Sequence, residues 1–505
     1  MSNTRSETGN VRVLLDLKPA LDGYAGIPQE TRLLFRGLRT MAGYDVEGLI
    51  QHGGRRLKSA VPSRGRKLPV SRRINRLSTM IVSMHENPYS SMFDTAVDAI
   101  EHYFALSLLR LRVLGGSRLT PGVFDSNLFD DFIWRSFFSK TLSPEDKDLV
   151  TSARYRVLRA PKYLLHKVGL TGLKLSQTPR YARIDTRDFD IFLAQTPFPA
   201  RVSRGTRMVV RYHDSVPVLM PHTISNKSFH QASHFYSLQE NVRAGAWFSC
   251  VSESTRNELL KIFPEAESRT TVIHNLVSSE YFDDPSPKGL IFQIIRNRLG
   301  TVEQFSTDLS SLRFDDKKDL VRDFDYLLMV STIEPRKNHL LMLGAWERLK
   351  YTSMPKLKLV VVGSIGWDHE PILSAFRPWA ERGDLFYLNS VPSSELRVLY
   401  KHAAATICPS LAEGFDYSGI EAMQSGGVVI SSDIPVHREI YGNASDYFNP
   451  YSAEEAAAAI SAILAGDIST RRERLRHEGR LVADRDSARN ILPKWSSFFE
   501  ALRGS

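Results

Sequence analysis

The second half of the chain alternates short apolar runs with helical patterns, and this rhythm restricts the fold more than any other feature. Runs that predict strands occur at residues 326–331, 358–363, 385–390, 406–410, 428–431 and 446–449. Continuous β-branched and aromatic runs are typical of strands buried on both faces of a parallel sheet. Strands that alternate with helices of this length predict a doubly wound α/β sheet, which binds ligands beyond the carboxyl ends of its strands.

The first half carries the same rhythm with a long interruption. Strands are expected at 11–17, 191–194, 208–211, 247–251 and 271–273. A chain of 505 residues also exceeds one ordinary core. We therefore expect two doubly wound domains that face each other across a cleft. Their predicted limits are a first domain at 1–285, with a basic and aromatic insertion at about 51–185, a connection at 286–322 and a second domain at 323–485.

Composition restricts the partners and the compartment. The 66 Lys and Arg residues outnumber the 56 Asp and Glu residues, for a formal net charge of +10, which suits anionic partners such as sugar nucleotides. Cys250 and Cys408 lie in apolar runs, so we interpret them as buried thiols in a reducing compartment. Residues 1–10 lack the apolar segment of a signal peptide, and no uncharged apolar run reaches the ~20 residues that span a bilayer. A cytoplasmic protein is expected.

A basic run extends from Arg55 to Arg76 and contains no acidic residue. Each cation near an anionic lipid surface contributes ~1 kcal/mol. Peripheral contact with the inner face of a membrane is therefore one interpretation, and a solvated loop is the other. The run lacks interleaved aromatic residues that could stack on bases, which argues against nucleic acid as a partner.

Two glutamates and two cations are the main candidates for chemistry. Glu413 lies in a glycine-containing loop after an apolar run, and Glu421, separated from it by seven residues, lies in an expected helix. Two carboxylates in this layout can grip hydroxyls at both ends of a sugar nucleotide. Arg336 and Lys337 precede another helix, whose N-terminus attracts anions, so the pair can hold a diphosphate. The alternatives are a solvated surface pair and, for Ser418 with Glu421, a helix-capping box.

Weaker features complete the candidate site. His213 follows the strand at 208–211 and can contact a substrate in the cleft; the alternative is a structural hydrogen bond. Gly26 lets backbone approach a phosphate or sugar, although its loop is not the glycine fingerprint of dinucleotide-binding proteins. The Asp-x-Asp patterns at 188–190 and 323–325 precede strands instead of following them, so no metal site is expected there.

Taken in order, these segments resemble the family 4 retaining glycosyltransferases of the GT-B fold. The likeness is strongest from 326 to 450. There, residues 331–338 have the sequence Ser-Thr-Ile-Glu-Pro-Arg-Lys-Asn, residues 361–367 have the sequence Val-Val-Gly-Ser-Ile-Gly-Trp, and both glutamates follow. Earlier matches are patchier and lie at 26–28, 213–214, 251–256 and 272–275.

The resemblance implies roles for the charged candidates. Arg336 and Lys337 would hold the donor diphosphate. Glu413 would lie beside the donor sugar, and Glu421 would bind the ribose. His213 would lie near the reacting sugar, on the acceptor side of the cleft.

The resemblance to the family 4 glycosyltransferases also implies roles for less polar residues. Gly26 would bring backbone close to the donor from across the cleft, and the backbone near Val391 would contact the base. Gly414 and Phe415 would belong to the donor site with Glu413. A helix at 486–505 would cross back to the first domain.

One motif departs from the family pattern. The family usually has Gly-Phe-Gly-Leu-Pro after the first glutamate, whereas residues 414–418 here are Gly-Phe-Asp-Tyr-Ser. The usual Gly-x-Pro-Val becomes Gly-Gly-Val-Val at 426–429. Asp416 therefore adds a charge beside the sugar site, which bears on the choice of donor.

These roles predict a retaining, metal-independent hexosyltransferase that needs no cofactor. The likeness to O-antigen and exopolysaccharide mannosyltransferases at 333–338 and 363–367 makes mannose from GDP-mannose the first choice of donor. The acceptor would be a glycan or a lipid-linked sugar in surface polysaccharide (lipopolysaccharide) biosynthesis. Two alternatives stay open: a GT-B isomerase or epimerase of a sugar nucleotide, and a non-catalytic binding protein recruited to the membrane by its basic run.

Overall fold

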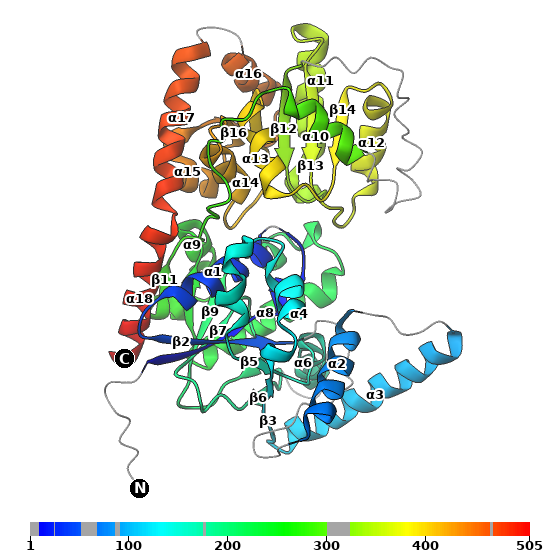
Figure 1. Cartoon of the computed structure of the whole chain (residues 1–505), viewed down its shortest axis with the longest axis vertical. Coiled ribbons are helices and arrows are strands. Elements are labelled where there is room, and N and C mark those ends of the chain that lie inside the picture. The colour runs from blue at the N-terminus through cyan, green and yellow to red at the C-terminus, as the bar shows by residue number, and fades with distance from the viewer. Residues whose placement is uncertain are drawn as a thin grey trace.

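The chain forms two α/β domains, each built on a parallel sheet with helices on both faces (Figure 1). The computed structural model describes residues 10–24, 26–51, 68–85, 91–174, 178–299, 324–464 and 468–504. Figure 1 shows the domains stacked, with the last two helices running beside both. The predicted pair of doubly wound domains is confirmed.

The first sheet has eight strands among the described residues, in the order β11-β10-β9-β7-β1-β2-β5-β4. All neighbours are parallel except β4 and β5. The strands predicted in this domain are confirmed, and β2, β4 and β5 are additional. The bounds are β1 (Val11–Asp16), β2 (Tyr44–Ile50), β4 (Gly122–Phe124), β5 (Tyr155–Val157), β7 (Ile191–Ala194), β9 (Arg207–Tyr212), β10 (Trp247–Cys250) and β11 (Thr270–Val272).

The second sheet is entirely parallel, in the order β14-β13-β12-β15-β16-β17. Every strand predicted in this half is confirmed, because these strands are buried on both faces and leave an uninterrupted apolar run in the sequence. The bounds are β12 (Tyr326–Val330), β13 (Lys358–Val362), β14 (Leu385–Leu388), β15 (Ala405–Cys408), β16 (Val429–Ser432) and β17 (Ser445–Phe448).

Helices cover both sheets. In the first domain they are α1 (Ile27–Thr40), α4 (Asp130–Ile133), α5 (Lys147–Thr151), α6 (Lys162–Thr171), α7 (Val216–Leu219), α8 (Lys227–Arg243) and α9 (Glu253–Ile262). In the second they are α10 (Leu290–Leu299), α11 (His339–Thr352), α12 (Glu370–Glu381), α13 (Ser393–His402), α14 (Tyr417–Gln424), α15 (Pro435–Tyr441) and α16 (Ala453–Leu464).

The segment 51–185, predicted as an insertion, is partly integrated into the first domain. Its strands β4 and β5 extend the main sheet, and a π-helical turn at Trp134–Phe138 packs Phe138 on Phe35 of α1, with ring centroids 5.3 Å apart. Three-residue strands leave too short a pattern to predict. The small strands β3 (Arg118–Leu119), β6 (Ala182–Ile184) and β8 (Ala200–Arg201) form a separate sheet. Two longer helices follow the second strand. α2 (Val70–His85) packs Leu77, Met80 and Met84 into the main core of the first domain, and α3 (Met92–Leu114) projects to one side in Figure 1.

The C-terminal helices join the domains. Helix α17 (Ile468–Arg485) packs on the second domain against α14, and α18 (Ala488–Gly504) packs on the first. Ile491, Trp495 and Phe499 of α18 are fully buried in the same apolar cluster as β1.

The predicted connection at 286–322 contains a helix that belongs to the second domain. Ile291, Ile294 and Ile295 of α10 are buried in the same cluster as Phe386 of β14. Residues 300–323 lie outside the described residues.

Cys250 and Cys408 are buried free thiols, as predicted. Among the described helices, none combines the length and apolar character needed to cross a bilayer.

Candidate active site

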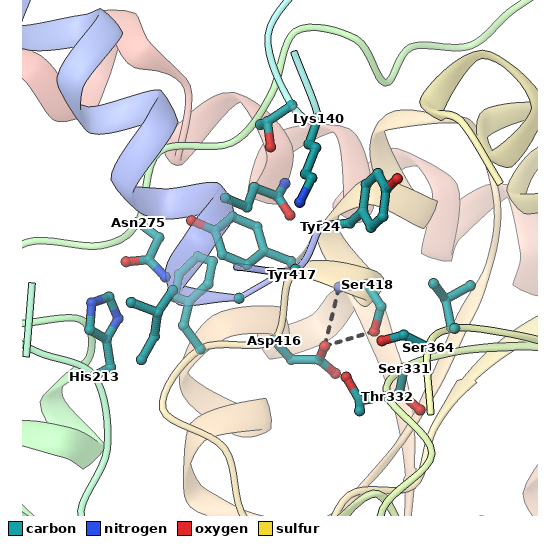
Figure 2. Close-up of a pocket in the computed structure, with 18 of the residues that line it drawn as sticks. Tyr24, Lys140, His213, Asn275, Ser331, Thr332, Ser364, Asp416, Tyr417 and Ser418 are labelled. Atoms are coloured by element: carbon teal, nitrogen blue, oxygen red, sulfur yellow. Dashed lines mark hydrogen bonds between the residues drawn. The ribbon is translucent and has the colours of Figure 1, made fainter. Parts of the chain in front are cut away.

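A cavity of about 870 Å³ lies between the domains, where the carboxyl ends of strands from both sheets meet. Figure 2 shows His213 of the first domain on one side of this cavity and Ser331, Thr332 and Ser364 of the second on the other. The structure brings every candidate residue to the cavity wall: Gly26, His213, Arg336, Lys337, Val391, Glu413, Gly414, Phe415 and Glu421.

Arg336, Lys337 and Glu413 form one charged cluster. Arg336 Nη1 donates to Glu413 Oε2 at 2.7 Å, and Lys337 Nζ contacts the other carboxylate oxygen. Burial alone would raise the pKa of Glu413, but the two cations outweigh it and hold the pKa below its usual range. The side chains of Arg336 and Lys337 are only 15% and 16% exposed, so the alternative of a solvated surface pair is wrong.

Local backbone structure fixes the two cations. Residues Pro335–Lys337 form a 3₁₀ turn between β12 and α11, and Asn338 ends it with a left-handed φ of 61°. Asn338 Nδ2 donates to the carbonyl oxygens of Pro409 at 3.1 Å and Pro450 at 2.8 Å. The turn that carries the cations is therefore tied to the loop after β15 that carries Glu413.

Glu421 projects from α14 into the junction between the domains. It accepts hydrogen bonds from Gln29 of the first domain at 2.8 Å and from Tyr400 at 3.1 Å. Burial raises the pKa of its carboxyl to about 7, and those two hydrogen bonds limit the rise. The capping-box alternative for Ser418 and Glu421 is wrong, because the glutamate does not turn back to the helix start.

Asp416 caps α14 instead. Its Oδ1 accepts from the backbone N–H of Ser418 at 3.1 Å and from the Ser418 hydroxyl at 2.7 Å, and its Oδ2 lies 3.4 Å from His437 Nε2. Burial alone would raise the pKa of Asp416, but His437 and the nearby Lys337 outweigh it and hold the pKa well below its usual range. The unusual residue of this motif is thus an ionised carboxylate in the cavity wall, beside Glu413.

His213 and Asp214 form the opposite wall, just beyond β9. The His213 side chain is buried, and its Nε2 has no hydrogen-bond partner among the described residues. Burial and the nearby Arg211 hold the pKa of His213 well below its usual range, so the ring is neutral. Burial raises the pKa of Asp214, and the charge of Arg336 across the cavity partly offsets that rise. A neutral imidazole nitrogen is thus free to meet a ligand in the cavity.

Two glycines shape the cavity for different reasons. A Cβ at Gly414 would lie 1.6 Å from the carbonyl oxygen of His213, so only glycine allows the two domains to meet at this point. Gly26 has a φ of 71° and lies just before α1, and a Cβ added there would have no described atom within 4 Å. The N-terminus of α1 therefore faces open space in the cavity.

A buried polar network lies beneath the cavity. Arg211 and Glu30 form a fully buried ion pair at 3.0 Å, and Arg211 also donates to Asn275 at 2.8 Å. The Tyr417 hydroxyl, from the second domain, donates to Glu30 at 2.9 Å. This network connects α1 and β9 with the motif that carries Glu413 and Glu421.

Several cavity residues were missed from sequence. Gln29 and Tyr400 hold Glu421, and Lys140 of the segment 51–185 reaches the cavity with its Nζ 5.5 Å from the centre of the Tyr24 ring. Figure 2 shows Lys140 and Tyr24 along the same edge of the cavity. Asp214 belongs to the match at 213–214 and Tyr400 to a segment that resembles the family, but neither was given a role, and nothing in the sequence pattern marks Gln29, Lys140 or Tyr24.

No group of three or more His, Cys, Asp or Glu side chains in the described parts of the chain could hold a metal ion. Asp190, from the first Asp-x-Asp pattern, accepts from the backbone N–H of Arg12 at 2.9 Å and ties two strands at their amino ends. Asp323 lies outside the described residues.

The chain is similar to known proteins in both domains. The family model "Glycosyltransferase Family 4" matches residues 137–281, and the family model "Glycosyl transferases group 1" matches residues 312–482. O-antigen chain mannosyltransferase B of Escherichia coli is 24% identical over 291 residues, which cover 57% of this chain and 69% of the relative. The serotype-specific mannosyltransferase WbdA of Escherichia coli is 34% identical over 139 residues, 27% of this chain but only 17% of that longer relative.

The fold has a full-length structural counterpart. Sucrose-phosphate synthase from Thermosynechococcus elongatus superposes with a TM-score of 0.58 at 14% identity, covering 98% of this chain and 100% of that one. Two parallel α/β domains with a polar cavity between them are the architecture of the GT-B fold. The chain belongs to the glycosyltransferase group 1/family 4 enzymes.

Proposed function

We propose that this glycosyltransferase transfers a hexose, with retention of configuration, from a nucleotide-diphosphate sugar to an acceptor hydroxyl. The observation that carries the proposal is the Arg336, Lys337 and Glu413 cluster at the carboxyl ends of β12 and β15, facing His213 across the cavity. The proposed enzyme needs no metal ion, because two fixed cations stand where the diphosphate would lie.

In the proposed mechanism, Arg336 and Lys337 take up the charge of the departing diphosphate. Stabilisation of this kind by a preorganised group contributes ~3–4 kcal/mol. The acceptor hydroxyl attacks the anomeric carbon from the face that the diphosphate leaves, and a phosphate oxygen accepts the hydroxyl proton. Glu413 orients the donor sugar and does not act as the nucleophile. Glu421 binds the ribose, and the neutral His213 contacts the reacting sugar.

We further propose GDP-mannose as the donor, and a glycan or lipid-linked acceptor in surface polysaccharide synthesis at the inner face of a membrane. The names of both curated relatives, O-antigen chain mannosyltransferase B and mannosyltransferase WbdA, support the sugar and the pathway class. Asp416 separates this chain from the usual motif, and it lies where it can accept hydrogen bonds from sugar hydroxyls. Thermal shift with a panel of sugar nucleotides tests the donor, and a larger shift with a UDP-sugar than with GDP-mannose would overturn that choice.

The test of the mechanism is release of nucleoside diphosphate by the purified protein in the presence of EDTA. Arg336→Ala and Lys337→Ala should each cut turnover at least ~100-fold. Arg348→Ala removes an exposed cation from α11, in the same domain, and should leave turnover unchanged. Full activity in both cavity variants would remove the leaving-group role.

Analysis of the product by NMR separates the alternatives. Transfer with retention gives a new glycosidic bond with the anomeric configuration of the donor. An epimer with its diphosphate bond intact would instead identify an isomerase, and binding of donor without turnover on any acceptor would favour a non-catalytic protein.

A further inference from the structure

Helix α3 exposes an apolar surface that the rest of the described chain does not cover. Figure 1 shows α3 extending outward from the first domain, with its N-terminal end farthest from the sheet. Leu106 and Leu109, in its C-terminal half, are buried in the cluster that contains Leu164 and Leu165 of α6. At 23 residues the helix is about 34 Å long. His102, near its middle, also contacts the domain, with its ring centroid 6.4 Å from that of Tyr163.

Six of the nine large apolar side chains that α3 exposes follow a heptad pattern, and Met92, Tyr103 and Leu108 lie off it. Apolar residues recur at alternating intervals of four and three, with Ser107 at the one polar position, and their side chains are 39% to 76% exposed. These residues, which we call the α3 stripe, are Phe93, Val97, Ile100, Phe104, Leu111 and Leu114. An apolar repeat of this kind is the seam of a coiled coil and requires a second helix to cover it.

The charges of α3 favour a second copy of the same helix. Asp94, Asp98 and Glu101 lie in its N-terminal half, and Arg110 and the exposed Arg112 lie in its C-terminal half. Arg110 also donates to Thr171 of its own domain at 3.0 Å, so Arg112 is the cation that a partner helix meets. An antiparallel pair places the acidic half of each helix against the basic half of the other, and it opposes the two helix dipoles. A two-fold axis through the centre of the stripe would make the surface complementary to itself.

The same charges disfavour a lipid surface. Interfacial helices carry Lys and Arg on their polar face and bind anionic headgroups. The half of α3 that projects farthest carries the three acidic residues and no Lys or Arg. An anionic membrane would repel that end.

We propose that α3 pairs with α3 of a second copy of this chain in an antiparallel coiled coil, so that the protein is a homodimer. The dimer is independent of the proposed catalytic roles, because the α3 stripe contributes no residue to the cavity.

Sedimentation equilibrium of the full chain tests the dimer. The expected mass is twice 57.1 kDa at high protein concentration, falling toward 57.1 kDa on dilution. Ile100→Asp with Phe104→Asp should give a monomer with unchanged nucleoside diphosphate release, whereas Ala99→Asp, on the same helix but off the stripe, should remain dimeric. A wild-type protein that is monomeric at every concentration would overturn the proposal.

Cross-linking tests the orientation. Phe104→Cys lies near the centre of the stripe and should cross-link to its own copy with a short bis-maleimide. Phe93→Cys should not, because the two ends of an antiparallel pair lie about 30 Å apart. Both native thiols are buried and should not react. Equal cross-linking at both positions would overturn the antiparallel arrangement. Flotation of a monomeric protein with phosphatidylglycerol vesicles, lost in Ile100→Asp, would replace the second copy with a lipid surface.

Discussion

Neutralising Glu421 is expected to stabilise the protein while weakening its hold on the donor. Burial raises the pKa of this carboxyl to about 7, against ~4.3 for an exposed Glu. The folded state therefore binds the Glu421 proton more tightly than the unfolded state. The stability that this proton contributes is fully present below about pH 4 and is lost as the pH rises through about 7.

The magnitude follows from the size of the pKa difference. Each pKa unit corresponds to about 1.4 kcal/mol, so a shift of nearly three units makes ionised Glu421 cost roughly 3–4 kcal/mol at pH 8. Glutamine has the shape of the protonated carboxyl and can keep the hydrogen bonds to Gln29 and Tyr400. Glu421→Gln should therefore raise the unfolding free energy by roughly 3–4 kcal/mol at pH 8 and by only about 1 kcal/mol at pH 5.

Glu413→Gln is the matched variant in the same cavity, with the opposite expectation. Arg336 and Lys337 hold the pKa of Glu413 below its usual range, so its stabilisation is present above about pH 4 and is lost as the pH falls through the folded pKa. Removing the charge leaves two buried cations without their carboxylate, at a cost of about 3–5 kcal/mol at pH 8.

Urea unfolding of both variants and the wild type at pH 5 and pH 8 measures these differences. If Glu421→Gln lowers the unfolding free energy at pH 8, or changes it equally at the two pH values, then burial does not govern the charge of Glu421. Under the proposed ribose role, the stabilised Glu421→Gln should also show a KM for the donor raised about tenfold or more, since a bond to a charged acceptor contributes ~1.5–3 kcal/mol.

Arg211→Met should destabilise the protein by about 3–5 kcal/mol in urea unfolding, because it leaves Glu30 buried without its cation. Adding Glu30→Gln should restore much of the lost stability. A double variant no more stable than the single one would contradict this account. Trp495→Ala should cost about 3–5 kcal/mol, because it opens a cavity where α18 meets the first domain, and its melting temperature is the measurement. His213→Asn should lower kcat about 100-fold with little change in donor affinity by calorimetry, because the ring is a preorganised polar contact to the reacting sugar in the proposed mechanism. An unchanged kcat would show that the role of His213 is structural.

The second domain was largely predictable because its strands are buried on both faces. Their apolar runs start and stop within a residue or two of β12 to β17, and the polar residues just after β12 and β15 had to lie at one edge of the sheet. In the first domain, β5 has three residues and the pairing of β4 crosses a long stretch of chain. Short, non-local pairings of this kind leave little periodicity to read.

Within the site, position was predictable and hydrogen bonding was not. Ser418 and Glu421 have the spacing of a capping box, yet Asp416 takes the capping role and releases Glu421 to the cleft. A glutamate that caps a helix and one that faces the cleft have the same local sequence pattern here. Only the tertiary hydrogen-bond partner determines which of the two roles Glu421 takes. Gln29 lies 392 residues before Glu421, and no local rule connects them.

Helix α18 completes an apolar core that begins with β1. On the ribosome, β1 emerges long before α18, so the first domain must wait for nearly the whole chain before its interior is sealed. Until then Trp495 and Phe499 have not been synthesised, and the apolar surface that they cover stays exposed to solvent. Vectorial synthesis should therefore keep the first domain protease-sensitive until α18 has been made, although its strands are the first to be synthesised.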